Sequence, residues 1–92
     1  MPLTLASGVE PAPELAFRDI GGEGVLLDLA TGTYFGLNRL GTRAWTLLVE
    51  GRSLAELHAQ LQDEFDVTPE ALERDLLAWA GALLEQKLIV LH

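Results

Sequence analysis

Cysteine is absent from the 92-residue sequence, which excludes disulfides, thiolate zinc sites and cysteine nucleophiles. Histidine is scarce as well, since only His58 and His92 occur. Gln62 stands four residues after His58, so no second metal ligand lies at that helical spacing. A chain without cysteine suits a reducing compartment. We therefore expect a cytoplasmic protein that binds no metal.

Basic residues are also few, with six Lys and Arg against fourteen Asp and Glu, for a formal net charge of -8. They are scattered singly along the chain, at Arg18, Arg39, Arg43, Arg52, Arg74 and Lys87. Proteins that bind nucleic acid neutralise its phosphates with clustered Lys and Arg. The sequence therefore predicts no nucleic-acid partner, and the negative charge favours solubility.

Long apolar runs are missing too, and none approaches the ~18 residues of a membrane-spanning helix. The N-terminus shows no basic start followed by a long apolar segment, so we expect no secretory signal and no membrane partner. Its Pro, Gly and Ser content predicts a flexible N-terminal segment over residues 1–13, either disordered or added to a sheet. Residues 14–92 then form one folded domain.

Patterns of catalytic residues are absent from the sequence. The glycines at positions 21, 22 and 24 are not followed by the Lys-Ser/Thr of a phosphate-binding loop. The acidic residues at 63–66 lack the alternating Asp and central Gly of a calcium loop. Neither Ser7 nor Ser53 has a candidate general base nearby in the sequence. We therefore expect a protein that is not an enzyme and uses no cofactor.

Strand-forming residues dominate the first half of the chain. Residues 14–19 are a candidate first strand, ended by two glycines. Residues 24–29 and 33–37 are rich in apolar and aromatic strand formers, and the turn between them contains Gly32. This pattern predicts a three-stranded antiparallel sheet whose last strand is an open edge. Such an edge can accept a peptide as one more strand.

Three helices are predicted after the strands. Asn38 is a candidate N-cap for a helix over residues 39–50, which ends at Gly51. Ser53 and Glu56 have the spacing of a capping box at the start of the second helix. Thr68 followed by proline opens a third helix, predicted to reach about residue 86, before a short strand over 88–91. The order predicts an α+β, winged helix-turn-helix-like fold.

The third helix carries an unusually wide apolar arc. Leu72, Leu76, Trp79 and Leu83 fall on one stripe, and a second apolar stripe lies beside it. A central helix that contacts both the sheet and the first helix would explain this width. Alternatively, the edge of the arc around Asp75 lines an exposed apolar groove beside the last strand. The two explanations are compatible.

The segments VLLDLATGTYFGLN, AWTLLVEGRS and the following helical stretch through residue 89 together resemble the PqqD family. These proteins are leader-peptide recognition elements of ribosomally made peptide pathways (RiPP recognition elements). The resemblance covers residues 14–91 and rests on the order and spacing of the motifs, including the Trp-x-Leu-Leu at 45–48 and the Glu-Gly-Arg-Ser at 50–53. It departs from the family pattern at Lys87, where glycine is common.

The resemblance implies that a leader peptide adds as a strand beside the hairpin and lies against the third helix. Carried over to this chain, the implied peptide-binding residues are Thr33, Tyr34, Phe35, Gly36, Leu37, Asp75, Leu76, Trp79 and Leu83. Tyr34 and Phe35 point to opposite faces of a strand, so only one of the two side chains can line the groove. Gly36 is explained equally well by close approach of another backbone or by a bulge.

The TGTYFGLN hairpin most resembles proteins of lasso-peptide pathways, which implies two partners, a precursor peptide and a leader peptidase. An alternative within the family is a PQQ-type peptide chaperone that serves a radical-SAM enzyme. Outside the family, the layout also suits a winged-helix DNA-binding regulator, although the acidic third helix argues against it. A further alternative is an oligomerisation module, in which the open edge forms a homodimer.

Overall fold

The computed structural model describes residues 3–92, and the first two residues of the predicted flexible segment lie outside the described residues. A meander of three strands precedes three helices, which confirms the predicted α+β fold. A further short strand stands at each end of the chain. The elements in order are β1 (Val9–Pro11), β2 (Leu15–Ile20), β3 (Glu23–Asp28), β4 (Thr33–Gly36), α1 (Arg39–Val49), α2 (Leu54–Glu64), α3 (Pro69–Glu85) and β5 (Ile89–Leu91).

The three-stranded sheet is antiparallel in the order β2-β3-β4. Phe17, Leu26 and Phe35 stand opposite one another across its strands. Gly32 has a φ of 77°, a left-handed conformation that glycine adopts without a steric penalty, in the turn between β3 and β4. The hairpin expected from the sequence is therefore present, within one residue of its predicted bounds.

Each helix begins at the predicted cap. The Oδ1 atom of Asn38 accepts a hydrogen bond from the Gly41 N–H at 2.8 Å, at the start of α1. Ser53 and Glu56 form both bonds of the capping box at α2. The Thr68 hydroxyl accepts from the Ala71 N–H at α3. Such local pairs satisfy N–H groups that have no partner within the helix, which is why they mark helix starts so clearly in a sequence.

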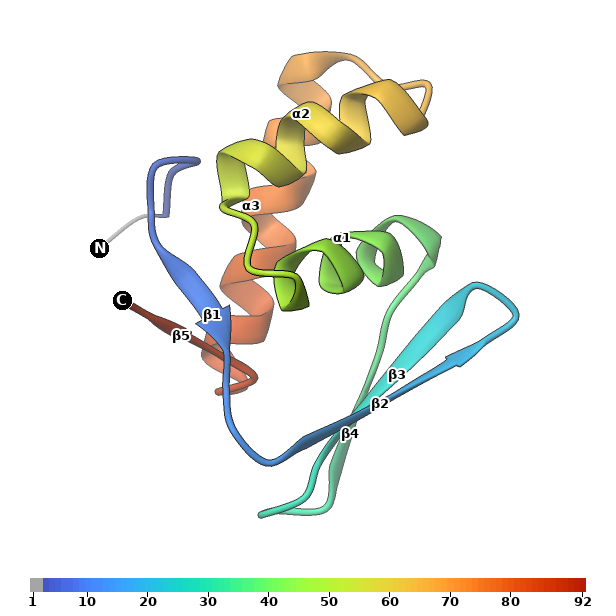
Figure 1. The fold of residues 1–92 in the computed structure, drawn as a ribbon, viewed down its shortest axis with the longest axis vertical. Coiled ribbons are helices and arrows are strands. Elements are labelled where there is room, and N and C mark those ends of the chain that lie inside the picture. The colour runs from blue at the N-terminus through green and yellow to red at the C-terminus, as the bar shows by residue number, and fades with distance from the viewer. Residues whose placement is uncertain (1–2) are drawn as a thin grey trace.

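The core lies between the sheet and the helices and consists mainly of leucine. Figure 1 shows the sheet nearly edge-on, with α1 over one of its faces. Leu26 from β3 is fully buried, as are Leu72, Leu76 and Leu83 from α3. Burying one such side chain contributes about 1.5–3 kcal/mol. The central position of α3 therefore explains most of its wide apolar arc.

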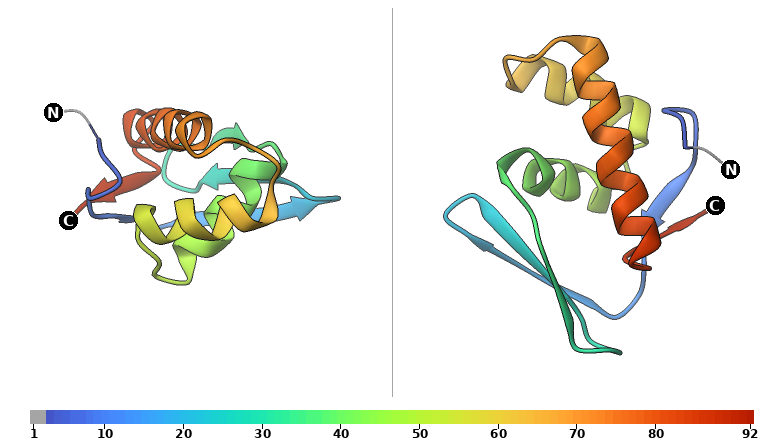
Figure 2. Two further views of the ribbon diagram at one scale, coloured as in Figure 1. Left: turned by 90° about the horizontal axis from the view of Figure 1, so that it is seen from above. Right: turned by 180° about the vertical axis from the view of Figure 1, so that it is seen from behind.

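A two-stranded ribbon joins the two ends of the chain. Part of the segment predicted to be flexible forms β1, which pairs antiparallel with β5 rather than with the larger sheet. Val9 is buried in the core, and the His92 N–H donates to the Gly8 carbonyl at 3.0 Å. Figure 2 shows this ribbon beside the C-terminal end of α3, away from the free end of the β2–β3 hairpin. The ribbon thus anchors residues 9–11 to the domain.

Within residues 3–92, no helix is long and apolar enough to cross a membrane.

Candidate peptide-binding groove

The outer edge of β4 is open, because among the described residues no strand pairs with it on the side away from β3. The Leu37 N–H donates to the Gly24 carbonyl at 2.8 Å, so Leu37 belongs to a bonded pair of the ladder. Bonded residues alternate along an antiparallel strand, which makes Phe35 the next bonded position. Tyr34 and Gly36 therefore direct their N–H and C=O groups away from the sheet, where another strand could bind them.

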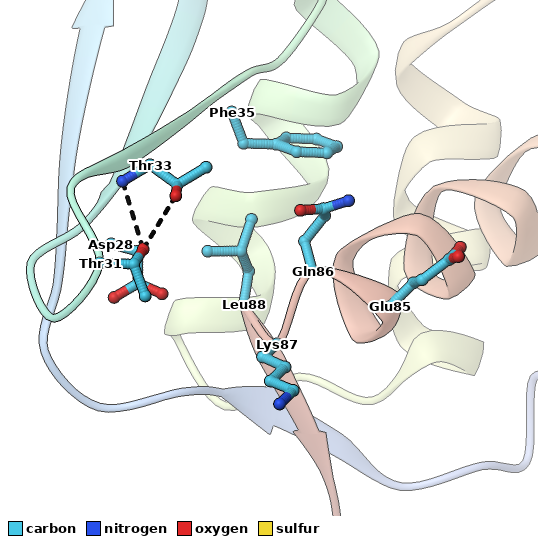
Figure 3. Close-up of a pocket in the computed structure, with 8 residues that line it drawn as sticks. All are labelled: Asp28, Thr31, Thr33, Phe35, Glu85, Gln86, Lys87 and Leu88. Carbon is cyan, nitrogen blue, oxygen red and sulfur yellow. Dashed lines mark hydrogen bonds between the residues drawn. The ribbon is translucent and has the colours of Figure 1, made fainter.

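A first cavity, of about 250 Å³, lies between β4 and the C-terminal end of α3 (Figure 3). Its wall contains Phe35 from β4, and Gln86 and Leu88 from the segment that follows α3. The turn before β4 forms another side, where the Thr33 N–H donates to Thr31 Oγ1. The lining residues are Asp28, Thr31, Thr33, Phe35, Glu85, Gln86, Lys87 and Leu88.

A second cavity, of about 130 Å³, lies between the first turns of α1 and the middle of α3. Its walls are mostly apolar, and Asp75 and Asn38 supply its polar side chains. The lining residues are Asn38, Leu40, Gly41, Ala44, Asp75, Leu76 and Trp79. The first cavity adjoins β4 at Thr33 and Phe35, and the second begins at Asn38, two residues after the strand ends. We call the β4 edge with these two cavities the groove.

The structure separates the two aromatic residues of β4. Phe35 is partly buried and lines the first cavity, because it stands opposite the buried Leu26 and shares its face of the sheet. Tyr34 is 70% exposed and lies on the opposite face, beside Leu27. Of these two side chains, only that of Phe35 reaches the groove, whereas Tyr34 contributes its backbone.

The other residues that the sequence assigns to the site fall into three groups. Thr33 lines the first cavity, and Asp75, Leu76 and Trp79 line the second. Gly36 is exposed on the open edge, and a Cβ built on it would meet no atom within 4 Å. Leu37 and Leu83 are buried in the core and line neither cavity. The structure therefore places most of these residues at the groove, whereas Leu37 and Leu83 belong to the core because their side chains are buried.

Several groove residues could not be found from the sequence. Asn38 has a clear signal as a helix cap, but nothing in its spacing shows that the first turn of α1 faces α3. Leu40 and Ala44 look like ordinary core positions of an amphipathic helix. Gln86 and Leu88 lie beyond the end of α3, where the left-handed conformation of Lys87 (φ 61°) turns the chain. Only tertiary packing brings these residues to the groove.

The face of the sheet opposite α1 is apolar and open. Figure 1 shows no helix over this face. Ile20 is 63% exposed there, and Val25 and Leu27 are partly exposed. A shallow hollow of about 760 Å³ on this side is lined by Ala16, Phe17, Arg18, Ile20, Val25, Leu27, Tyr34 and Gly36. We call this surface the outer sheet face.

The polar groups of the site do not form a recognisable catalytic or metal-binding arrangement. Within residues 3–92, no group of three or more His, Cys, Asp or Glu side chains could hold a metal ion. His58, the histidine on α2, has its Nε2 2.9 Å from the Pro69 carbonyl, outside the groove. What the groove offers is unpaired strand backbone, a first cavity lined mainly by polar side chains and a second, mostly apolar cavity. An open strand edge of this kind can accept an extended peptide.

Comparison with solved structures finds close relatives of this fold. One, described as TbiB1 in complex with the TbiA(beta) leader peptide, is 38% identical, with a TM-score of 0.82 over 87% of this chain and 93% of that one. Another, lasso peptide synthetase B1 complexed with the leader peptide, is 28% identical, with a TM-score of 0.80 over 89% and 96%. No curated protein sequence matches the chain.

The family model for coenzyme PQQ synthesis protein D matches residues 23–89, which run from β3 through the three helices into β5. This match covers both sides of the groove and most of the core. All the motifs that carried the resemblance in the sequence lie within it. The chain belongs to the PqqD family.

Proposed function

We propose that this protein binds the leader region of a ribosomally made precursor peptide by adding it as a strand to β4. One observation carries the proposal: β4 has an open edge, and a cavity lies between this strand and the C-terminal end of α3. Support comes from the two similar structures, both of which are complexes with leader peptides. Those proteins have nearly the length of this chain, so the similarity spans the whole domain.

The geometry suggests how such a peptide is held. The outward N–H and C=O groups of Tyr34 and Gly36 offer up to four backbone hydrogen bonds, which give affinity with little dependence on sequence. Side chains alternate along a strand, so every second leader residue points toward the cavities beside Phe35 and Trp79. Specificity then comes from the fit of those residues. We expect a dissociation constant of about 1 µM or tighter, on the order of -8 kcal/mol.

We further propose that the protein is not an enzyme, and that it presents the bound precursor to a processing enzyme, a leader peptidase of a lasso-peptide pathway. The outer sheet face supports this step, because exposed apolar patches mark protein–protein contacts. Tyr34 links the two surfaces, since its backbone lies on the groove edge and its side chain on the outer sheet face. A leader bound on β4 would extend that face by one strand.

A fluorescence-polarisation titration tests leader binding. The labelled leader of the precursor encoded beside the gene is titrated with the protein, and a scrambled leader serves as the control. We expect saturable binding of the true leader alone. No binding of the true leader at tens of micromolar protein would contradict the proposal.

Two substitutions at Gly36 test strand addition in the same assay. Gly36→Pro removes an N–H that points to the open edge without breaking a bond to β3, so we expect affinity to fall about tenfold or more. Gly36→Ala is the matched control, because its Cβ enters open space and its N–H is retained. Equal affinity of both variants for the leader would rule out a backbone contact at this position.

A further inference from the structure

The indole of Trp79 has a buried hydrogen-bond donor without a partner. Its Nε1 atom is shielded from solvent, and within residues 3–92 no acceptor lies within hydrogen-bonding distance and geometry. Leaving such a donor unpaired is costly, and buried polar groups in native proteins are nearly always paired. A donor that is buried without a partner therefore needs an explanation. The position of Trp79 on the groove suggests that a bound peptide provides the missing acceptor.

The surroundings of this atom are built from the start of α1. Trp79 lines the second cavity together with Asn38 and Gly41. A Cβ built on Gly41 would lie 2.9 Å from Trp79 Nε1, so any side chain at this position would collide with the indole nitrogen. The same Cβ would lie 3.2 Å from Asn38 Oδ1, which already accepts a hydrogen bond from the Gly41 N–H at 2.8 Å. Glycine thus keeps the space beside the indole N–H free of a side chain.

We propose that the Trp79 indole N–H is a specificity-determining donor of the groove. When a peptide fills the second cavity, the indole or the first turn of α1 shifts, and the N–H that is shielded in the free protein pairs with an oxygen of the peptide. The inference rests on the proposed function and adds to it the chemistry of one contact. The other walls of this cavity are mostly apolar, from Leu40, Ala44 and Leu76, and Asp75 is its one charged side chain. An acceptor that meets the indole N–H in such surroundings is shielded from water, where a hydrogen bond is stronger than on the surface.

The indole N–H resonances in a ¹H–¹⁵N NMR spectrum test this pairing directly. The chain has two tryptophans, and Trp45→Phe assigns the two signals by removing one. Trp45 lies in the core and lines neither cavity, which makes it the matched control. On saturation with the leader, we expect the Trp79 indole proton to move downfield and exchange more slowly with solvent, while that of Trp45 changes little.

The same titration separates this inference from the proposed function. Saturable leader binding in the polarisation assay with no larger change at the Trp79 indole than at Trp45 would overturn the inference and leave leader binding intact. Absence of leader binding in both assays would overturn the proposed function itself, and the inference with it.

Trp79→Phe gives a second test, because it keeps an aromatic ring and removes the N–H. We expect leader affinity to fall about threefold to tenfold, the usual effect of losing one hydrogen bond. Trp45→Phe is expected to leave leader affinity unchanged. A thermal melt of each variant verifies that it folds. A folded Trp79→Phe variant with the affinity of the wild type would contradict the inference.

The source of the acceptor can be found with alanine variants of the leader in the NMR experiment. A side-chain oxygen predicts one leader position at which alanine abolishes the shift of the Trp79 indole proton. A backbone carbonyl predicts that the shift persists in every variant that still binds. The first result identifies the leader residue whose side chain supplies the acceptor, and the second assigns the acceptor to the leader backbone.

Discussion

Phe35 and Tyr34 are neighbours in one strand, yet their side chains serve different surfaces. Phe35 lines the first cavity of the groove beside Leu88, and Tyr34 stands on the outer sheet face. The twofold alternation of a β-strand requires that one of them face each way. Which one faces the groove is decided by the pairing of Phe35 with the buried Leu26, a register that the strand's own sequence does not specify.

This difference predicts unequal effects of two substitutions on leader affinity. Phe35→Ala removes an apolar wall of the first cavity, and we expect leader affinity to fall about tenfold or more. Tyr34→Ala keeps the backbone groups of the edge, so a smaller loss is expected. Fluorescence polarisation with the same labelled leader measures both. A larger loss for Tyr34→Ala than for Phe35→Ala would show that the leader binds on the outer sheet face instead.

At the scale of elements, α1 and α2 are joined by an ion pair at a distance from the groove. Arg43 on α1 donates two hydrogen bonds to the Glu64 carboxylate at the end of α2, at 2.8 and 2.9 Å. Gln60 donates to the same carboxylate at 2.7 Å. The hydrogen bond from Arg43, and that from Gln60, lower the pKa of Glu64 to about 2. This pairing stabilises the folded state and has no direct role in the groove.

The lowered pKa of Glu64 predicts an acid-sensitive contribution to stability. A carboxyl whose folded-state pKa lies below its unfolded value stabilises the fold fully above about pH 5, and loses this effect as the pH falls from about 4.5 to about 2. Because both side chains reach solvent, we expect the ion pair to contribute only about 1 kcal/mol to the free energy of unfolding at pH 7. Thermal unfolding of the wild type and Glu64→Gln at several pH values measures this difference.

The control for this experiment is Glu50→Gln. Glu50 is paired with Arg52 at 3.3 Å, and the side chains of both residues are more than 40% exposed. Replacing Glu50 should therefore lower the free energy of unfolding less than replacing Glu64 does. A stability difference between the wild type and Glu64→Gln that stays constant down to pH 2 would contradict the account of the ion pair.

The elements that the sequence predicted well are those specified by nearby residues. Asn38, Ser53 and Thr68 mark helix starts because each cap bonds to a residue three positions on. The ribbon of β1 and β5 was not predicted as a pair, since its strands are three residues long and some eighty residues apart. The α1 side of the second cavity was missed for the same reason, because it meets Asp75, Leu76 and Trp79 only where α1 packs against α3.

At the scale of the whole molecule, the domain is thin and has two candidate binding surfaces, the groove and the outer sheet face. Its principal extents are 36 × 33 × 19 Å, so the groove and the outer sheet face lie close together through β4. We propose that the first surface takes the precursor and the second takes the processing enzyme. A homodimer formed through the β4 edge would occupy the backbone groups that the leader needs. Dimer formation and leader binding would then compete.

Amide hydrogen exchange of β4, with and without the leader, tests the central claim of strand addition most directly. The N–H groups of Tyr34 and Gly36 point to the open edge, whereas that of Phe35 points to β3. We predict that saturating leader slows exchange at Tyr34 and Gly36 by about tenfold or more, as expected for N–H groups newly hydrogen-bonded in a sheet. Saturable leader binding with unchanged exchange at both residues would contradict strand addition to β4.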